Sequence, residues 1–161
     1  MPHDPVALFA AHRLSLVRLA VLLVDDLASA EDVVQNAFAG FVARRRPLDD
    51  PDKALAYLRT AVVNNARSAL RRRRTVRGYV APRGVGPDGP DGRVILAEEH
   101  REVLDALDRL APRQREVLVL RYWSEMSEAE IAAALGISRG SVKSTASRAI
   151  EALEKIMEGS R

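Results

Sequence analysis

A stretch rich in glycine and proline divides this chain of 161 residues near its middle. The sequence YVAPRGVGPDGPDGR runs from Tyr79 to Arg93 and includes Pro82, Pro87 and Pro90. Proline lacks the backbone donor that a helix needs, and glycine loses more conformational entropy on ordering than any other residue. We therefore expect residues 76–94 to be a flexible linker between two small domains, residues 1–75 and residues 95–161.

Both parts of the chain have the composition of helical globular domains. Hydrophobic residues make up 47% of the sequence and aromatic residues only 4%, so the core must be aliphatic. Apolar residues recur at helical spacing and seldom alternate with polar ones, which favours an all-α fold. We expect helices at about 5–24, 30–46, 51–74, 95–110, 112–123, 127–135 and 138–157.

Several classes of function are disfavoured by the residue content. The chain has no cysteine, which excludes disulfides, thiol catalysis and cysteine-based zinc sites. Its histidines, His3, His12 and His100, are scattered along the sequence. No carboxylate pair, nucleophile elbow or phosphate loop is visible. We therefore predict a protein that is not an enzyme, with no catalytic residue, no cofactor and no metal ion.

The apolar segment 5–24 raises the question of a membrane. It is long enough to span a bilayer, but His12, Arg13 and Arg18 interrupt it. Each central arginine would cost about 2.5–3.5 kcal/mol on insertion, so we expect an amphipathic helix and no membrane insertion. Asp4 precedes the apolar run and no basic segment does, which is unlike a signal peptide. The expected location is the cytoplasm.

The cations of the chain are almost all arginine, 22 against 3 lysines, with a formal net charge of +3. Arginine can form paired hydrogen bonds with phosphates and guanine edges. In the helix expected at 51–74, polar and basic side chains gather away from the apolar face, which suits a nucleic-acid backbone. These residues are Arg59, Asn64, Arg67, Arg71 and Arg74. The residues alone leave open two other roles, compensation of the helix dipole and simple solubility.

The segment 127–148 has the spacing of a helix-turn-helix. Ser127 and Glu130 form a capping box, and Gly136 is placed to end the first helix in a left-handed conformation. Ala132, Gly136 and Val142 are small or slender enough for two helices to cross closely.

Polar and cationic side chains follow the turn, after Ser138 caps the second helix. The first turns of such a helix enter the major groove of DNA, where hydroxyls and cations reach phosphates and base edges. The predicted DNA contacts are Arg139, Ser141, Lys143, Ser144 and Arg148. The alternative is a helical hairpin with a solvated polar face.

A third candidate surface lies on the helix expected at 30–46. We predict that this helix begins after Ser29 and exposes a polar patch of Glu31, Asp32, Gln35 and Asn36. One interpretation is an acidic first turn that stabilises the helix dipole. The other is a docking surface for a basic partner helix. The residues alone favour the first.

Taken together, these segments resemble an extracytoplasmic-function sigma factor of the sigma-70 family, over nearly the whole chain. SAEDVVQNAF is similar to the region 2.2 helix and AYLRTAVVNNARSALRRRR to regions 2.3–2.4. RLAPRQREVLVLRYWSEMSEAEIAAALGISRGSVKSTASRAIEAL is similar to region 4 from end to end. The similarity is greatest to a subgroup common in high-GC bacteria.

The resemblance implies partners for the three surfaces. The patch at 31–36 would contact the β′ clamp coiled coil of core RNA polymerase. The region 4-like domain would bind the β flap and read the −35 promoter element through the five residues of 139–148. The five residues of 59–74, with the loop at 49–52, would hold the melted −10 strand. An anti-sigma factor is a further implied partner.

Four residues depart from the family pattern, and two other functions compete with it. Asn36 and Ser68 stand at positions that are usually acidic, Asn65 at an apolar position and Leu70 at a tryptophan position. The first rival is a stand-alone helix-turn-helix regulator that binds operator DNA without polymerase. It would need dimerisation for specificity, and no heptad stretch supplies it. The second rival is an adaptor that binds polymerase or an anti-sigma factor without promoter activity.

Overall fold

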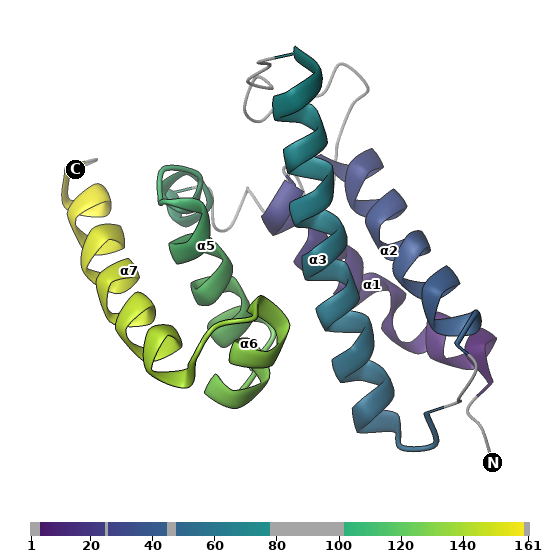
Figure 1. The fold of residues 1–161 in the computed structure, drawn as a ribbon. Helices are drawn as coiled ribbons and strands as arrows, with labels where there is room; N and C mark the ends of the chain where they lie inside the picture. Colours follow the sequence, from purple (N-terminus) through teal and green to yellow (C-terminus); the bar gives the residue numbers. More distant parts are fainter. Residues whose placement is uncertain (1–3, 25, 45–47, 78–101, 160–161) are drawn as a thin grey trace. The chain divides into compact units, whose positions relative to one another are not determined.

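The computed structural model describes residues 4–24, 26–44, 48–77 and 102–159. Within these ranges every regular element is a helix, and the helices form two compact units, one within Met1–Gly92 and the other within Arg93–Arg161 (Figure 1). The all-α prediction is confirmed. Residues 76 and 77 of the expected linker belong to a helix, and residues 78–94 lie outside the described ranges.

In the described part of the first unit there are three helices: α1 (Pro5–Val24), α2 (Leu27–Val42) and α3 (Pro51–Arg77). Each packs against the other two, as Figure 1 shows. The core is mainly aliphatic, with Leu19 and Leu58 among its fully buried side chains, but it also contains Phe38 and Phe41. Burial of such side chains supplies most of the stability of a unit this small.

The long apolar helix α1 is part of this core. Its length and mean hydropathy of 1.8 would allow it to cross a membrane. Nine of its 20 residues are buried, eight of them between Leu16 and Val24. Those side chains face α2 and α3, while Arg13 and Arg18 are exposed. The apolar surface between Leu16 and Val24 is therefore covered by protein, whereas Val6 and Leu14 earlier in the helix are exposed.

The second helix begins earlier than the sequence predicted. Asp26 is its N-cap residue, and the Asp26 carboxylate accepts a hydrogen bond from the Ser29 backbone N–H at 2.8 Å. The predicted start after Ser29 is wrong because Asp26 already satisfies that donor. Glu31 and Asp32 consequently lie in the second turn, beyond the strongest field of the helix terminus. The helix ends at Val42 rather than near residue 46.

The third helix begins at Pro51, as expected. The Asp50 carboxylate accepts the Asp52 N–H at 2.9 Å, and Pro51 occupies the first helical position. The helix continues to Arg77, three residues beyond the expected end. It thus carries the arginine run on a continuous helix.

The second unit contains a helical segment at 102–108, then α5 (Pro112–Leu118), α6 (Glu128–Leu135) and α7 (Arg139–Gly159). Its helices α5 and α7 pack together (Figure 1). A small core forms around Leu118 and Ala149, covered by Leu153 and its neighbours.

The helix expected at 112–123 changes its hydrogen bonding before it ends. Pro112 opens it as predicted, but Val119–Trp123 is a π-helical turn. The Ser124 N–H donates to the Val119 carbonyl oxygen at 3.2 Å, five residues back. This wider turn leaves Tyr122 and Trp123 exposed at the surface, a local change that apolar periodicity does not encode.

Candidate nucleic-acid interface

The turn between α6 and α7 is built by local hydrogen bonds that the sequence predicted. The Glu130 N–H donates to Ser127 Oγ at 3.1 Å, and the Ser127 N–H donates to Glu130 Oε1, also at 3.1 Å. Gly136 ends the helix with φ 68°, in the left-handed region. The capping box and the glycine stop are both confirmed.

The start of α7 is fixed by Ser138. Its hydroxyl oxygen accepts the Ser141 N–H at 3.0 Å, and its carbonyl oxygen accepts the Val142 N–H, also at 3.0 Å. Val142 is fully buried and Ala132 is 8% exposed. The small residues therefore lie inside the turn, where the close crossing of α6 and α7 requires them.

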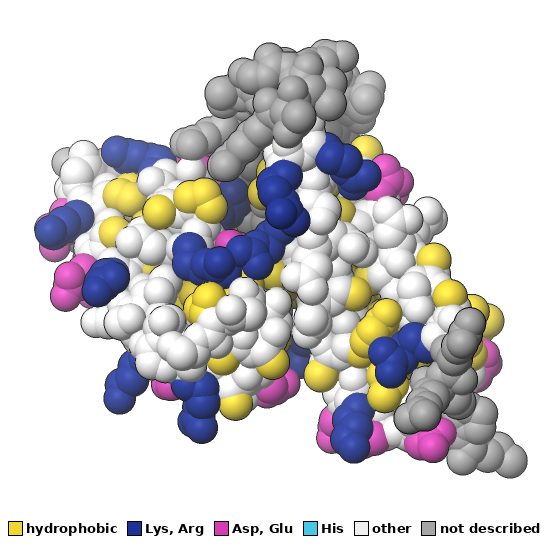
Figure 2. Space-filling view, in the orientation of Figure 1, with side chains coloured by type: hydrophobic (Ala, Val, Ile, Leu, Met, Phe, Trp, Pro, Cys, Tyr) yellow, Lys and Arg dark blue, Asp and Glu magenta, His cyan; other side chains and the backbone are white. Residues whose placement is uncertain are grey.

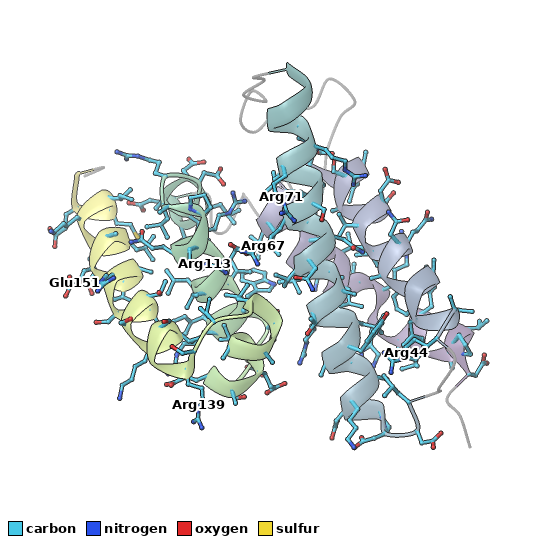
Figure 3. All side chains as sticks on the ribbon, in the orientation of Figure 1. Arg44, Arg67, Arg71, Arg113, Arg139 and Glu151 are labelled. Atoms are coloured by element: carbon cyan, nitrogen blue, oxygen red, sulfur yellow. The ribbon has the colours of Figure 1, made fainter. Side chains whose placement is uncertain are left out.

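The outer face of α7 carries the predicted DNA contacts. All of them are exposed, while Val142, Ala146 and Ala149 face inward. The exposed set is Arg139, Ser141, Lys143, Ser144 and Arg148. Figure 3 shows Arg139 projecting from the end of the unit where α6 meets α7, and Figure 2 shows basic side chains on the surface there. The arrangement is a convex helix face with cations and hydroxyls.

The side chains on the basic face of α3 differ in their exposure. Asn64 and Arg71 are exposed, Arg59 and Arg67 are half-buried, and the side chain of Arg74 lies outside the described set. Spacings of three and four residues place Asn64, Arg67, Arg71 and Arg74 along one side of the helix. Figure 3 shows Arg67 and Arg71 leaving α3 on the same side.

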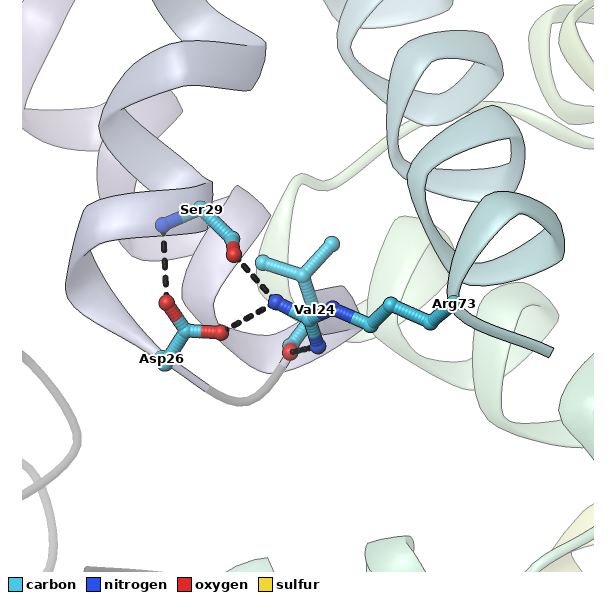
Figure 4. Close-up of polar contacts among 4 residues, drawn as sticks. All are labelled: Val24, Asp26, Ser29 and Arg73. Carbon is cyan, nitrogen blue, oxygen red and sulfur yellow. Dashed lines mark hydrogen bonds and ion pairs between the residues drawn. The ribbon is translucent and has the colours of Figure 1, made fainter. Parts of the chain in front are cut away.

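One arginine of the run 71–74 has a structural role that the sequence did not reveal. Arg73 donates to the Val24 carbonyl oxygen at 3.1 Å, to Asp26 Oδ2 at 2.5 Å and to Ser29 Oγ (Figure 4). These acceptors lie at the end of α1 and the beginning of α2. Arg73 therefore joins all three helices of the first unit at one corner.

The same contacts change the acidity of the N-cap carboxyl. Burial by itself raises the pKa of Asp26, but hydrogen bonds from the Ser29 N–H and the Arg73 guanidinium outweigh it. The net effect holds the pKa of Asp26 below its ordinary value of 3.8. The charged carboxylate is thus the form that the corner stabilises.

Three of the four residues of the polar patch on α2 are exposed. Glu31 is half-buried and pairs with Arg13 of α1 at 3.4 Å. Asp32, Gln35 and Asn36 are exposed. Because neither acidic residue lies in the first turn, helix-dipole compensation does not explain the patch. That interpretation, which the residues alone favoured, is wrong.

A polar groove of about 490 Å³ borders this patch between α2 and α3. The Asn65 side-chain amide donates to the Val33 carbonyl oxygen across it, at 3.3 Å. The groove is lined by Ser29, Asp32, Val33, Asn36, Asn65, Ser68, Ala69 and Arg72. Three of the four departures, Asn36, Asn65 and Ser68, therefore gather here. The fourth, Leu70, is half-buried elsewhere on α3.

Comparison with known protein families assigns both units. Residues 8–76 match the family described as "Sigma-70 region 2", and residues 100–153 match "Sigma-70, region 4". The chain belongs to the sigma-70 family. Its function is accordingly that of an RNA polymerase sigma factor, which recognises promoters and initiates transcription with the polymerase.

Individual relatives identify the extracytoplasmic-function group within that family. The RNA polymerase sigma-E factor of Streptomyces coelicolor is 38% identical over 142 residues, which cover 88% of this chain and 78% of the relative. The probable ECF RNA polymerase sigma factor SigI of Mycobacterium tuberculosis is 34% identical over 157 residues, covering 91% and 53%. The expected similarity to proteins of high-GC bacteria is confirmed.

Solved structures agree with the sequence matches. CnrH, in complex with the cytosolic domain of CnrY, superimposes with a TM-score of 0.71 at 27% identity, covering 98% of this chain and 89% of that chain. The extracytoplasmic-function sigma factor SigJ of Mycobacterium tuberculosis gives 0.66 at 30% identity, covering 92% and 53%.

Proposed function

We propose that this sigma factor directs core RNA polymerase to promoters through three separate surfaces, acting in the cytoplasm by binding and not by catalysis. The outer face of α7 carries the proposal, because every predicted contact on it is exposed at the start of a helix whose inner face is buried. Such a helix can enter a major groove without rearrangement of the unit.

The outer face of α7 reads the −35 element as a duplex. Arg139 and Lys143 lie four residues apart and face the same side, where they reach phosphate oxygens. Ser141, Ser144 and Arg148 cover the remaining face and contact base edges or the other strand.

The basic face of α3 holds the −10 element after melting. Asn64 offers an amide that can pair with a base edge, and Arg71 offers an exposed guanidinium for phosphate or stacking contact. Arg59, Arg67 and Arg74 extend this face along the helix. Of the loop expected at 49–52, residues 51 and 52 belong to α3. The Asp52 N–H donates to the Asp50 carboxylate, and this bond orders the remaining loop residues, which would lie beside the melted DNA strand.

The α2 patch binds core polymerase at the β′ clamp coiled coil, and the second unit binds the β flap. Asp32, Gln35 and Asn36 supply exposed acceptors for a basic partner helix. Glu31 contributes less because Arg13 already partners it. Ser68 and Arg72 line the adjoining groove on its α3 side.

An anti-sigma factor is a further proposed partner. CnrH was solved in complex with the cytosolic domain of CnrY. The similarity to CnrH covers 98% of the present chain. A partner that covered the α2 patch would prevent polymerase binding by simple exclusion.

Two double variants test whether the surfaces act separately. Asp32→Ala with Gln35→Ala should weaken the affinity for core polymerase about tenfold or more, because truncation of residues that carry the binding energy of an interface costs more than about 1 kcal/mol. Arg139→Ala with Lys143→Ala should leave co-elution unchanged and weaken promoter binding by the holoenzyme. If both variants lost both activities, the patches would be structural.

Mixing the wild-type chain with core RNA polymerase in size-exclusion chromatography distinguishes the rival functions. Co-elution followed by promoter-dependent transcription supports the sigma factor. Co-elution without transcription from any promoter would indicate the adaptor. A folded chain that did not co-elute, yet bound duplex DNA, would be a stand-alone regulator.

A further inference from the structure

Gly140 is a helical glycine that the fold itself does not require. It is the second residue of α7 and is exposed. Its φ is not positive, in contrast to Gly136. A Cβ added to Gly140 would have Ser138 Oγ, at 3.9 Å, as its nearest neighbour, which is ordinary van der Waals contact. An alanine side chain would therefore fit without displacing any atom of the protein.

Glycine is also a poor helix former, since it loses more backbone entropy on ordering than alanine does. At Gly136 the left-handed backbone explains the choice, and at Gly40 a Cβ would approach the Tyr57 hydroxyl to 3.4 Å. Neither reason applies to Gly140. Contacts within the unit therefore do not account for the missing side chain at Gly140.

The position of Gly140 on α7 indicates which kind of partner could use the space left by the missing side chain. At about 100° per residue, Gly140 falls in the middle of the exposed face of α7. Lys143 lies on one flank of it, and Ser144 and Arg148 lie on the other. The first residue at the centre of this face therefore has no side chain, and cations lie on both sides of that residue.

We infer that Gly140 sets the depth to which α7 enters the major groove. This inference rests on the proposed −35 function of the same face. Without a Cβ, the backbone at the start of α7 can touch the floor or wall of the groove while the cations on each side reach phosphates. A methyl group there would hold the helix outward and withdraw Ser144 from the base edges, which hydrogen bonds read only at contact distance.

Gly140→Ala and Gly159→Ala form a matched pair for testing this inference. Gly159 lies at the opposite end of the same helix, is exposed, and has no atom within 4 Å of an added Cβ. The probe is a promoter duplex that the wild-type holoenzyme selects from a randomised library. Gly140→Ala should weaken binding of the holoenzyme to this duplex about tenfold or more, as overpacking of a tight contact does. Gly159→Ala should bind as wild type does.

Thermal unfolding of both variants provides the second measurement. The midpoint should stay unchanged or rise in each, because alanine favours the helix. Wild-type affinity in Gly140→Ala would overturn the inference while leaving the −35 function intact. Weaker binding accompanied by a lower midpoint would also overturn it, since the glycine would then serve the fold. If the wild-type holoenzyme selected no duplex, the proposed −35 function itself would fail.

Discussion

At the scale of single residues, the arginine run at the end of α3 shows that adjacent identical side chains can have different structural roles. Arg71 and Arg72 are exposed, whereas Arg73 reaches back to the end of α1 and the N-cap of α2. The difference follows from helical rotation of about 100° per residue, which turns one of the guanidinium groups toward the corner of the bundle. The run 71–74 therefore contains a structural residue beside exposed ones.

Arg73→Ala is expected to destabilise the first unit by about 1–3 kcal/mol, because it removes charge-assisted hydrogen bonds and leaves the Asp26 carboxylate unpaired. Its neighbour provides the control: Arg72→Ala should change the free energy of unfolding by less than about 0.5 kcal/mol. Urea denaturation followed by circular dichroism measures both. Equal effects in the two variants would mean that the corner contacts contribute nothing net.

The lowered pKa of Asp26 makes part of this stability dependent on pH. Because the folded pKa lies below 3.8, the stabilisation is fully present above that value and is lost as pH falls through the folded pKa. Asp26→Asn keeps a capping oxygen but removes the charge. The stability difference between wild type and Asp26→Asn should be constant from pH 7 to about 5 and shrink below about pH 4. A difference that persisted undiminished at the lowest accessible pH would contradict this account.

At the scale of elements, the short helix α6 depends on the residues at its two ends. α6 has 8 residues, too few to be stable alone, and depends on its capping box and on the left-handed Gly136. Gly136→Ala should cost about 1–2 kcal/mol, because an L side chain at φ 68° is strained. Gly159→Ala, with ordinary φ, should be neutral or slightly stabilising. Chemical denaturation of the two variants compares them directly, and equal stability would show that the turn relaxes without strain.

The features that the sequence could predict are those that depend on local contacts. The capping box, Gly136, the Ser138 cap and the start of α3 were predicted correctly because each depends on contacts within four residues. The N-cap at Asp26 was missed, since Asp26 and Ser29 are both good capping residues and Arg73, far along the chain, contacts both. The groove of Asn65 and Ser68 also depends on the packing of α3 against α2, which composition does not encode.

At the scale of the whole molecule, the proposed surfaces divide between two units that fold around separate cores. The α2 and α3 surfaces belong to the first unit and the α7 surface to the second. Substitutions on separate cores are expected to change binding free energies additively where the substituted residues contact no common residue. Under the proposed function, substitutions in the α2 patch should therefore change polymerase affinity without changing −35 recognition by α7.

The salt dependence of promoter binding tests that division quantitatively. Each phosphate contact to duplex DNA steepens the plot of log K against log salt by about 0.9, so Arg139→Ala with Lys143→Ala should reduce the slope by about 1.8. Lys155→Ala, an exposed cation near the other end of α7, is the control and should leave the slope unchanged. Adding Arg71→Ala on α3 should reduce the slope by a further amount of about 0.7, the value for a single strand, only when the −10 region is melted. If that further reduction also appeared on fully duplex DNA, α3 would contact double-stranded DNA, and its assignment to the melted strand would be wrong.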